Sequence, residues 1–215
     1  VLGVQMERDG NSVLLGDMLR SCSLLEWKAE QKWQGVAHSY HSDWITAVAM
    51  GKCWLATDSL GNLQALQAST NDGRITCLGA MHLGQTVNRL LRLGPRGLFT
   101  DAWLYFTTLG TIGLIGFCGE EKISAVLRQL ESKLATAHPW LGQFDQAAWR
   151  LPHAALGDSR SWPTSGYFVD GLQVERWSTL TTEEQGRIWS GEDEERTGFT
   201  CADLTRLIGE ISLSK

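Results

Sequence analysis

Long apolar runs are missing from this sequence: none approaches the roughly 18 residues that a membrane-spanning helix needs. Basic residues are also few, with 19 Lys and Arg against 24 Asp and Glu and a formal net charge of −5. That balance makes the chain a poor binder of nucleic acid on its own, because non-specific affinity comes from Lys and Arg that neutralise phosphates. A local basic patch stays open, and the nearest to a cluster is Arg89, Arg92 and Arg96. The apolar residues at the start follow neither a Met nor a charged region, so we expect no signal peptide and a cut through a longer chain.

No C-x-x-C spacing occurs among the five cysteines, and three of them lie inside apolar, strand-like runs. We interpret the thiols as reduced core residues of an intracellular protein. The five are Cys22, Cys53, Cys77, Cys118 and Cys201.

Motifs for catalysis and for cofactors are absent as well. No G-x-S-x-G is present, and the Gly-rich segment 110–119 lacks the G-K-[ST] of a phosphate loop. His38, His41 and Asp43 have a spacing that could hold zinc on a helix, but here they fall in a strand end and a loop. We therefore expect no enzyme, no metal and no cofactor, and keep a hydrolase with an unusual site as a hypothesis for a turnover screen.

What the sequence has is a series of apolar runs separated by turn residues over its first 118 positions. Three stretches read as strand, turn, strand, and they align without gaps at offsets of 40 and 50 residues. A repeat of that length with about four short strands is typical of a β-propeller blade, although no blade ends in the Trp-Asp pair of plain WD repeats. The three stretches are VLLGDMLRSCSLLEW (13–27), CWLATDSLGNLQALQ (53–67) and WLYFTTLGTIGLIGF (103–117).

The fold class predicted for residues 1–118 is therefore mainly β, a partial, WD40-like β-propeller of about two and a half blades. A generic antiparallel sandwich stays open as the alternative. A ring usually needs roughly four to eight blades, and an open stack leaves an unpaired sheet edge and an uncovered apolar face. The rest of the ring is expected upstream of Val1 or on another chain.

Residues 119–215 change to the three- and four-residue spacing of amphipathic helices, which predicts a small helical domain. A first helix should end at His138, and Thr181 and Thr200 should cap two later helices. The acidic stretch 191–195 is predicted to be a solvated loop. The apolar face of the first helix is expected at Ile123, Val126, Leu127, Leu130 and Leu134.

Seven phrases, in matching order and spacing over nearly all of the chain, resemble one protein family. The resemblance is to the carboxy-terminal end of the large subunit of the UV-damaged-DNA-binding complex, the adaptor of cullin-4 ubiquitin ligases. That family has V-G-D-L-M-R-S, P-N-W-M-S-A-V and F-H-L-G-E-F-V-N where this chain has the first three phrases. The seven phrases are LLGDMLRS (14–21), SDWITAVAM (42–50), MHLGQTVN (81–88), YFTTLGTIGLI (105–115), AAWR (147–150), GYFVDGLQVE (166–175) and TCADLTRLIGEI (200–211).

Two related families share this architecture: the propeller subunit of splicing factor 3B and the large subunit of the cleavage and polyadenylation specificity factor. The M-L-R-S phrase and the final A-D-L-T-R-L-I helix favour the ubiquitin adaptor branch. The differences between this sequence and the family's phrases are large enough for the chain to come from a fungal paralogue of the adaptor, which would work in replication repair or heterochromatin. A structural subunit in RNA processing remains the alternative function.

The resemblance implies three propellers followed by a helical domain, of which this chain would hold the last blades and that domain. In the family, the first and third propellers form a cavity in which substrate receptors insert a helical motif, and the second propeller, absent here, binds the cullin. DNA would be reached indirectly, through a receptor. The expected location is the nucleus and cytoplasm.

The family's receptor-contacting positions carry over unevenly to this chain. The resemblance assigns Arg20, Trp44 and Asn88 to matching positions. His38 stands where the family has Arg, and Thr86 where it has an aromatic residue, so a charged and an apolar contact are weakened. Two alternatives stay open, since Trp44 at a strand start could belong to the core and Arg20 in a turn could simply pair with Asp17.

Overall fold

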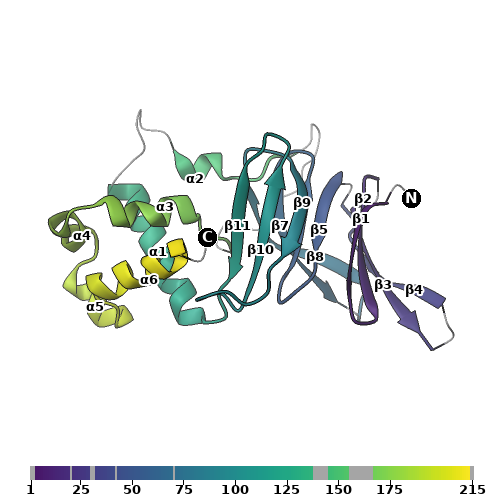
Figure 1. Ribbon diagram of the computed structural model, residues 1–215, viewed down its shortest axis with the longest axis horizontal. Coiled ribbons are helices and arrows are strands. Elements are labelled where there is room, and N and C mark those ends of the chain that lie inside the picture. Colours follow the sequence, from purple (N-terminus) through teal and green to yellow (C-terminus); the bar gives the residue numbers. More distant parts are fainter. Residues whose placement is uncertain are drawn as a thin grey trace. The chain divides into compact units, whose positions relative to one another are not determined.

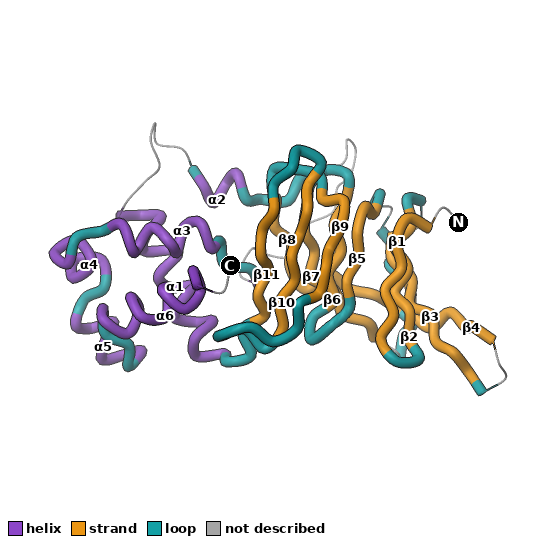
Figure 2. Tube along the Cα trace, viewed as in Figure 1, coloured by secondary structure: helices purple, strands orange, loops and turns teal. Residues whose placement is uncertain are grey.

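The computed structural model describes residues 3–19, 21–29, 32–41, 43–69, 71–137, 145–154 and 167–213. The chain forms two compact units, coloured by secondary structure in Figure 2. The strand unit comprises Val1–Gly94, Asp101–Phe117 and Arg150–Tyr167. The helical unit comprises Pro95–Thr100, Cys118–Trp149 and Phe168–Lys215. A segment beyond the last strand thus returns to the strand unit.

The strand unit consists of three antiparallel groups of strands, which we call blades, as expected for a partial β-propeller (Figure 1). The last strands of blades one and two meet in one parallel pair, His38 opposite Arg74, so that these two blades form one eight-stranded sheet. Blade one is β1 (Gly3–Asp9), β2 (Ser12–Asp17), β3 (Ser21–Lys28) and β4 (Lys32–His38). Blade two is β5 (Ile45–Ala49), β6 (Trp54–Asp58), β7 (Asn62–Ser69) and β8 (Arg74–His82). Blade three is β9 (Val87–Arg92), β10 (Asp101–Thr107) and β11 (Ile112–Phe117).

All three predicted hairpins are confirmed: β2 pairs with β3, β6 with β7 and β10 with β11. The sequence pattern does not predict β8 and β9 as separate strands, and of β4 it indicates only the end near His38. These strands lack a clear apolar alternation, because β4 is mostly exposed and β9 has two exposed residues between its buried Val87 and Leu90 and two more after Leu90. Pairing with a neighbouring strand, rather than their own pattern, keeps them extended.

The gapless alignment of the hairpins is wrong by one residue. Asp17, Asp58 and Thr107 each end the second strand of a blade and start its turn, so equivalent positions lie 41 and 49 residues apart by their numbers. Val13 is therefore equivalent to Trp54, not Cys53. The turn fixes the register of a hairpin, and apolar identity alone does not reveal a shift of this size.

Blades one and two bury an apolar core between them, around Leu14, Leu24, Ile45 and Val48. Gly16 makes this approach possible, because a β-carbon there would lie 2.7 Å from Ile45 Cγ2 and 2.9 Å from Val48 Cγ1. The small residue lets two β-sheets pack more closely than a larger side chain would allow.

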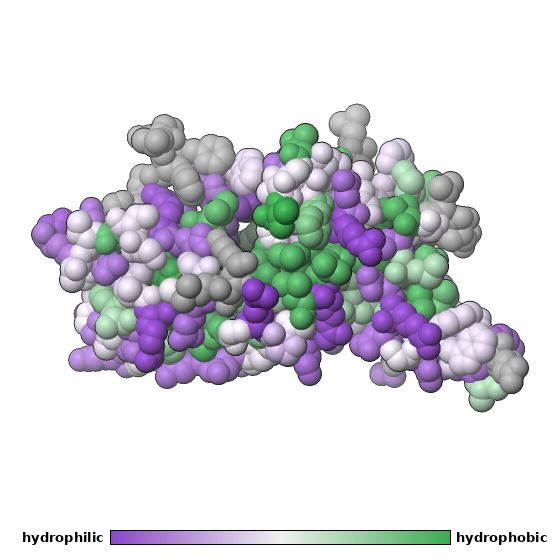
Figure 3. Space-filling model, in the orientation of Figure 1, coloured by the Kyte–Doolittle hydropathy of each residue, from purple (hydrophilic) through white to green (hydrophobic). Residues whose placement is uncertain are grey.

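Blade three has one buried and one uncovered face. Trp103 and Leu90 are buried on the face toward blade two, where a β-carbon on Gly51 would come within 2.6 Å of Trp103. Leu91, Leu104 and Leu114 form a cross-strand row on the other face. Apolar side chains gather there in Figure 3, and Leu91 is 44% exposed. The described residues of the strand unit leave this face uncovered.

The free end of the β3–β4 hairpin carries an aromatic pair. Trp27 and Trp33 are cross-strand partners. Their rings meet edge to face with centroids 5.2 Å apart and planes 65° apart. Both indoles are partly exposed, so the pair stabilises the hairpin without belonging to the core between the blades.

The helical unit packs its helices around one apolar cluster. The predicted face of the first helix is confirmed, since all five of its apolar positions are buried. Among the described residues, no helix is both long and apolar enough to cross a membrane. The helices are α1 (Glu121–Ala137), α2 (Gln146–Trp149), α3 (Gly171–Glu175), the 3-10 helix η3 (Arg176–Thr179), α4 (Thr182–Ile188), α5 (Gly191–Thr197) and α6 (Cys201–Leu213).

The predicted caps are confirmed and the predicted acidic loop is wrong. Thr181 caps α4 in a capping box with Glu184, and Thr200 Oγ1 accepts a hydrogen bond from Asp203 N. The stretch 191–195 belongs to α5. Acidic side chains in its first turn favour the helix. Asp193 is buried and accepts from Ser190 N at 2.9 Å and from Lys133 Nζ at 2.6 Å.

A buried carboxylate, ion-paired within blade three, also accepts a hydrogen bond from the turn between β5 and β6 of blade two. Asp101 is fully buried and accepts from Lys52 N at 3.0 Å and from Arg92 Nε at 3.0 Å, while Arg92 NH2 lies 2.8 Å from Asp101 Oδ2. Burial alone would raise the pKa of this carboxyl, but the hydrogen bonds from Arg92 and the Lys52 N–H outweigh it and lower the pKa. The folded state therefore favours the ionised carboxylate.

We predict that Asp101→Ala lowers the free energy of unfolding by roughly 1–3 kcal/mol, because Arg92 and the Lys52 N–H lose their partner. Denaturant unfolding monitored by circular dichroism measures this. Glu26→Ala is the matched control, since its partly exposed pair with Lys28 should contribute at most about 1 kcal/mol. Equal losses in the two variants would contradict the role of Asp101.

Candidate functional site

The three hairpin turns between the second and third strands are built alike. The side chain that ends the second strand accepts a backbone N–H of its own turn. Asp17 Oδ1 accepts from Leu19 N at 2.6 Å, and Asp58 Oδ1 from Leu60 N at 2.9 Å. In blade three, Thr107 Oγ1 accepts from Thr111 N at 2.9 Å. One side-chain bond thus fixes each turn at the same end of its blade.

Each of these turns exposes a leucine at its third position. Leu19 is 60% exposed, Leu60 42% and Leu109 78%. Single exposed leucines are ordinary on a protein surface, but recurrence at one position of three adjacent blades is a pattern. These leucines are not among the site residues that the sequence predicts, although the repeats carry a signal for them, a Leu two positions after Asp17, Asp58 and Thr107.

Trp44 and Thr86 are held beside the turns of blades two and three. Ser59 N donates to Trp44 O at 2.9 Å, and Thr86 Oγ1 donates to Ser59 O at 3.3 Å. Thr108 N donates to Thr86 O at 3.0 Å. Trp44 is 57% exposed, so it does not belong to the core of the strand unit described here. We call Leu19, Trp44, Leu60, Thr86 and Leu109 the turn surface.

The other predicted site residues lie differently. His38 ends β4 and is exposed. Its imidazole contacts the neighbouring strand β3 of the same blade, with Nδ1 3.3 Å from Ser23 Oγ. Asn88 is exposed on β9. Arg20 lies outside the described residues, and so does any pairing of its side chain with Asp17. The structure therefore brings Trp44 and Thr86 together and leaves His38 apart from them.

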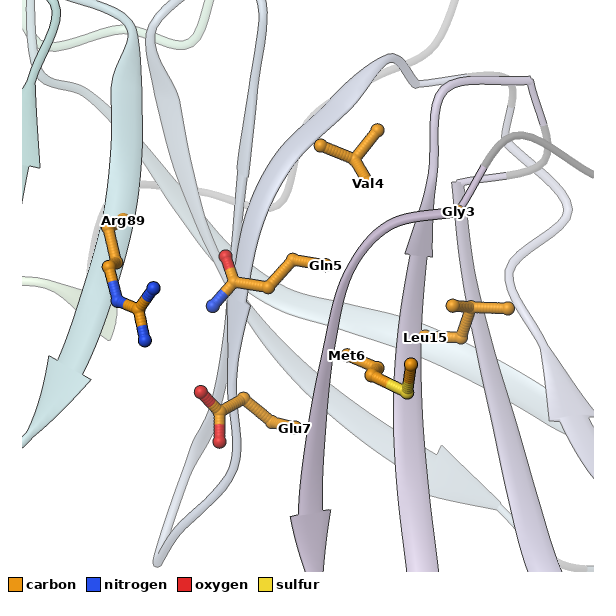
Figure 4. Close-up of a pocket in the computed structure, with 7 residues that line it drawn as sticks. All are labelled: Gly3, Val4, Gln5, Met6, Glu7, Leu15 and Arg89. Carbon is orange, nitrogen blue, oxygen red and sulfur yellow. The ribbon is translucent and has the colours of Figure 1, made fainter.

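Asn88 is followed by Arg89, which lines a hollow of about 380 Å³ between β1 and β9. Figure 4 shows Arg89 on one strand facing Gln5 and Glu7 on the other. The hollow brings together one basic and one acidic side chain. No group of three or more metal-binding side chains occurs among the residues that the structure describes, so nothing there resembles a metal centre.

Three of the cysteine thiols lie in surroundings that disfavour the thiolate. Cys22 is fully buried, and burial raises its pKa to about 12. Burial also raises the pKa of Cys53 and of Cys201. Since only the thiolate is reactive, these groups suit packing better than chemistry.

A polar network lies directly beneath the turn surface. Asn62 Nδ2 donates to Asp58 Oδ2 at 2.8 Å, and Gln64 Nε2 lies 3.3 Å from Asp43 Oδ2. All four side chains are buried. Burial raises the pKa of Asp58, although hydrogen bonds from Asn62 and Leu60 N oppose this. The network gives Leu60 and Trp44 a rigid base, because satisfied buried polar groups hold one arrangement.

The same asparagine holds a segment from far along the chain, residues 150–154, which we call the strap. His153 N donates to Asn62 Oδ1 and Asn62 Nδ2 donates to His153 O, both at 2.8 Å. His82 N donates to Arg150 O at 2.9 Å, and the His82 and His153 rings stack with centroids 3.7 Å apart. This stretch has no apolar period, so the sequence gives no sign of these contacts.

We predict that Asn62→Ala lowers the free energy of unfolding by roughly 2–3 kcal/mol, because Asp58 Oδ2 loses its shortest hydrogen bond and the His153 backbone loses both of its bonds to the Asn62 side chain. Limited proteolysis should also cut the strap faster than in the unmodified protein. Asn88→Ala is the matched control at an exposed asparagine and should change stability by less than about 0.5 kcal/mol. Unchanged cleavage of the strap in Asn62→Ala would contradict this assignment.

His82 makes the strap sensitive to acid. Burial lowers its pKa to about 4, and the charges of His153 and Arg150 act in the same direction. The unfolded chain therefore takes up the proton first as pH falls from the ordinary histidine pKa of 6.5 towards 4, and stability is lost over that window.

The corresponding measurement is the free energy of unfolding at pH 7 and pH 5. We predict that His82→Gln reduces the loss between these two pH values, while His41→Gln, at an exposed histidine, leaves it unchanged. A loss in His82→Gln as large as in the unmodified protein would exclude His82 as its source.

Comparison with curated proteins finds relatives that carry one name. DNA damage-binding protein 1 of Oryza sativa subsp. japonica is 24% identical over 228 residues, covering 99% of this chain and 20% of that protein. DNA damage-binding protein 1b of Arabidopsis thaliana is 26% identical over 226 residues, covering 96% of this chain and 20% of that protein. The chain thus spans about a fifth of the length of these relatives.

The family match extends over both units. The sequence profile of the family described as CPSF A subunit region matches residues 1–179, which include all three blades and the start of the helical unit up to η3. Because this match covers well over half of the sequence, the chain belongs to the CPSF A subunit region family.

Proposed function

We propose that the chain is part of a non-enzymatic scaffold, an adaptor of a cullin-RING ubiquitin ligase, whose turn surface holds helical docking motifs of substrate receptors. The observation that carries this proposal is the largely exposed Trp44, held by Ser59 beside Leu60 on a rigid polar base. Family membership and relatives named DNA damage-binding protein 1 support it.

The chemistry of the turn surface suits an amphipathic helix. Its exposed groups are a tryptophan and leucines, and buried carboxylates lie beneath them rather than beside them. An apolar stripe at three- and four-residue spacing can cover such positions on neighbouring blades. Tryptophan is also among the residue types that dominate the binding energy of interfaces.

Thr86 makes this surface different from the one that the family resemblance implies. Its hydroxyl donates a hydrogen bond to Ser59 O within the protein, so Thr86 gives a receptor less apolar contact area than an aromatic ring would. Leu60 and Leu109 beside it supply apolar area instead. A receptor of this chain should therefore present its apolar side chains to the turns of blades two and three.

The proposal includes the rest of the polypeptide and the place in the cell where it works. The upstream propellers of the same polypeptide would complete the cavity and bind the cullin through the middle propeller. DNA would be reached through a receptor, in repair or in chromatin regulation such as heterochromatin, and the protein would work in the nucleus and cytoplasm.

We predict that Trp44→Ala combined with Arg20→Ala in the full-length protein weakens receptor binding by roughly 30-fold or more, which corresponds to the loss of about 2 kcal/mol at a hot spot. Co-purification of receptors measures this, and cullin capture from the same sample reports that the protein is folded. Trp27→Ala is the matched control, a partly exposed tryptophan away from the turn surface. Unchanged receptor recovery would overturn the proposal.

The second candidate is a structural subunit of an RNA-processing complex, favoured by the description CPSF A subunit region of the matching family. A pull-down of the full-length protein followed by peptide identification separates the two. Cullin and receptors support the adaptor, whereas splicing or polyadenylation factors support the alternative.

A further inference from the structure

Helices α1 and α5 of the helical unit leave a hollow of about 180 Å³ between them. The side chains that α1 contributes lie on one face of that helix, at three- and four-residue spacing. The other wall comes from the last two residues of α5. The hollow is lined by Lys122, Ala125, Val126, Gln129, Arg196 and Thr197.

The ammonium group of Lys122 is held at this hollow by an aromatic ring. Lys122 Nζ lies 5.3 Å from the centroid of the Phe199 ring, and a β-carbon on Gly198 would lie 3.4 Å from the same nitrogen. Among the residues that the structure describes, no carboxylate forms an ion pair with it. A cation–π contact orients a lysine but leaves its positive charge uncompensated.

Arg196 brings a second cation to the hollow. Its side chain is 67% exposed, and its ion pair with Asp193 is long, with Nη2 3.3 Å from Oδ1. The same carboxylate already accepts from Lys133 Nζ at 2.6 Å and from Gln129 Nε2 at 2.8 Å. Because Lys133 compensates the charge of Asp193, the walls of the hollow carry a surplus of positive charge.

The other acidic side chains of the two helices do not line the hollow. Glu194 accepts from Cys201 N at 3.1 Å, and Glu192 and Glu195 are exposed on α5. Glu121 is exposed at the start of α1. Solvent screens these exposed charges, whereas a ligand inside the hollow would contact the two cations directly.

The available donors suit one carboxylate better than a phosphate. Thr197 Oγ1 already donates to Asp193 O at 2.7 Å, and the Gln129 amide donates to Asp193 Oδ1. The two cations are therefore the main donors left for a ligand. A guanidinium matches the two oxygens of a carboxylate, while a phosphate has three acceptor oxygens and nearly two charges to satisfy.

The remaining lining of the hollow is apolar. Val126 is 2% exposed and belongs to the core of the helical unit, and Ala125 beside it in sequence is exposed. Methylene groups of a ligand would cover these two side chains. A glutamate combines two methylenes with one carboxylate, so its side chain matches both parts of the lining, which an inorganic anion does not.

We propose that the hollow between α1 and α5 binds a glutamate side chain of an acidic peptide segment in a partner protein. Lys122 and Arg196 hold the carboxylate, and the methylenes lie on Ala125 and Val126. Charge complementarity argues for this occupant, since two cations without a full complement of acids face an apolar floor. This site goes beyond the proposed function and does not depend on receptor docking at the turn surface.

Fluorescence anisotropy of the full-length protein with the probe fluorescein-Gly-Glu-Val-Glu-Val-Glu-amide tests the site. We expect saturable binding that Lys122→Gln combined with Arg196→Gln weakens at least roughly tenfold. The matched control, Arg187→Gln combined with Arg206→Gln, removes the same charge on α4 and α6, where each arginine has its own carboxylate partner. It should change the affinity by less than about twofold. Equal losses in the two double variants would overturn the proposal, because net charge rather than the hollow would then bind the probe.

Ala125→Leu tests the hollow without changing its charge. The larger side chain should fill the space and weaken probe binding at least roughly tenfold, while thermal unfolding stays unchanged because the position is exposed and leucine is a good helix former. A probe with Gln in place of each Glu should not bind at the same concentrations. The proposal is wrong if the Glu probe shows no saturable binding, if the Gln probe binds equally well, or if Ala125→Leu keeps the full affinity.

Discussion

The hydrogen bonds of Asp58 and Asn62 are the constraint on which the rest of the strand unit depends. Asp58 closes the turn of blade two, and Asn62 joins that turn to the strap. Both side chains are buried, so their bonds form away from competing water. Ser59, within the same turn, holds Trp44. One polar network therefore sets the blade end, the returning segment and the exposed tryptophan.

The elements that the sequence predicts are those whose pattern is set locally. The hairpins and α1 follow from alternation and from three- and four-residue spacing, and both were confirmed. The strands β8 and β9 and most of β4 were missed because pairing keeps them extended despite a weak pattern. Helix α5 was missed because its acidic residues suggested solvent, while Asp193 is buried against Lys133.

The candidate site is also only partly predictable from the sequence. Trp44 was found through resemblance, and the leucines of the turns were overlooked although each follows its turn-closing residue at a fixed interval. Their exposure depends on tertiary structure, since the same leucine in a packed turn would be core. The strap contact of His153 with Asn62 joins residues 91 positions apart and leaves no periodic trace in the sequence.

The edge-to-face contact of Trp27 and Trp33 has a spectroscopic consequence. Two indoles at this separation couple their electronic transitions, and the sign and size of the resulting exciton couplet depend on the angle between the rings. Most of the other tryptophans lack such a partner at close range among the described residues. The far-ultraviolet dichroism of this chain should therefore carry an intrinsic optical marker of the β3–β4 hairpin, readable without any attached dye.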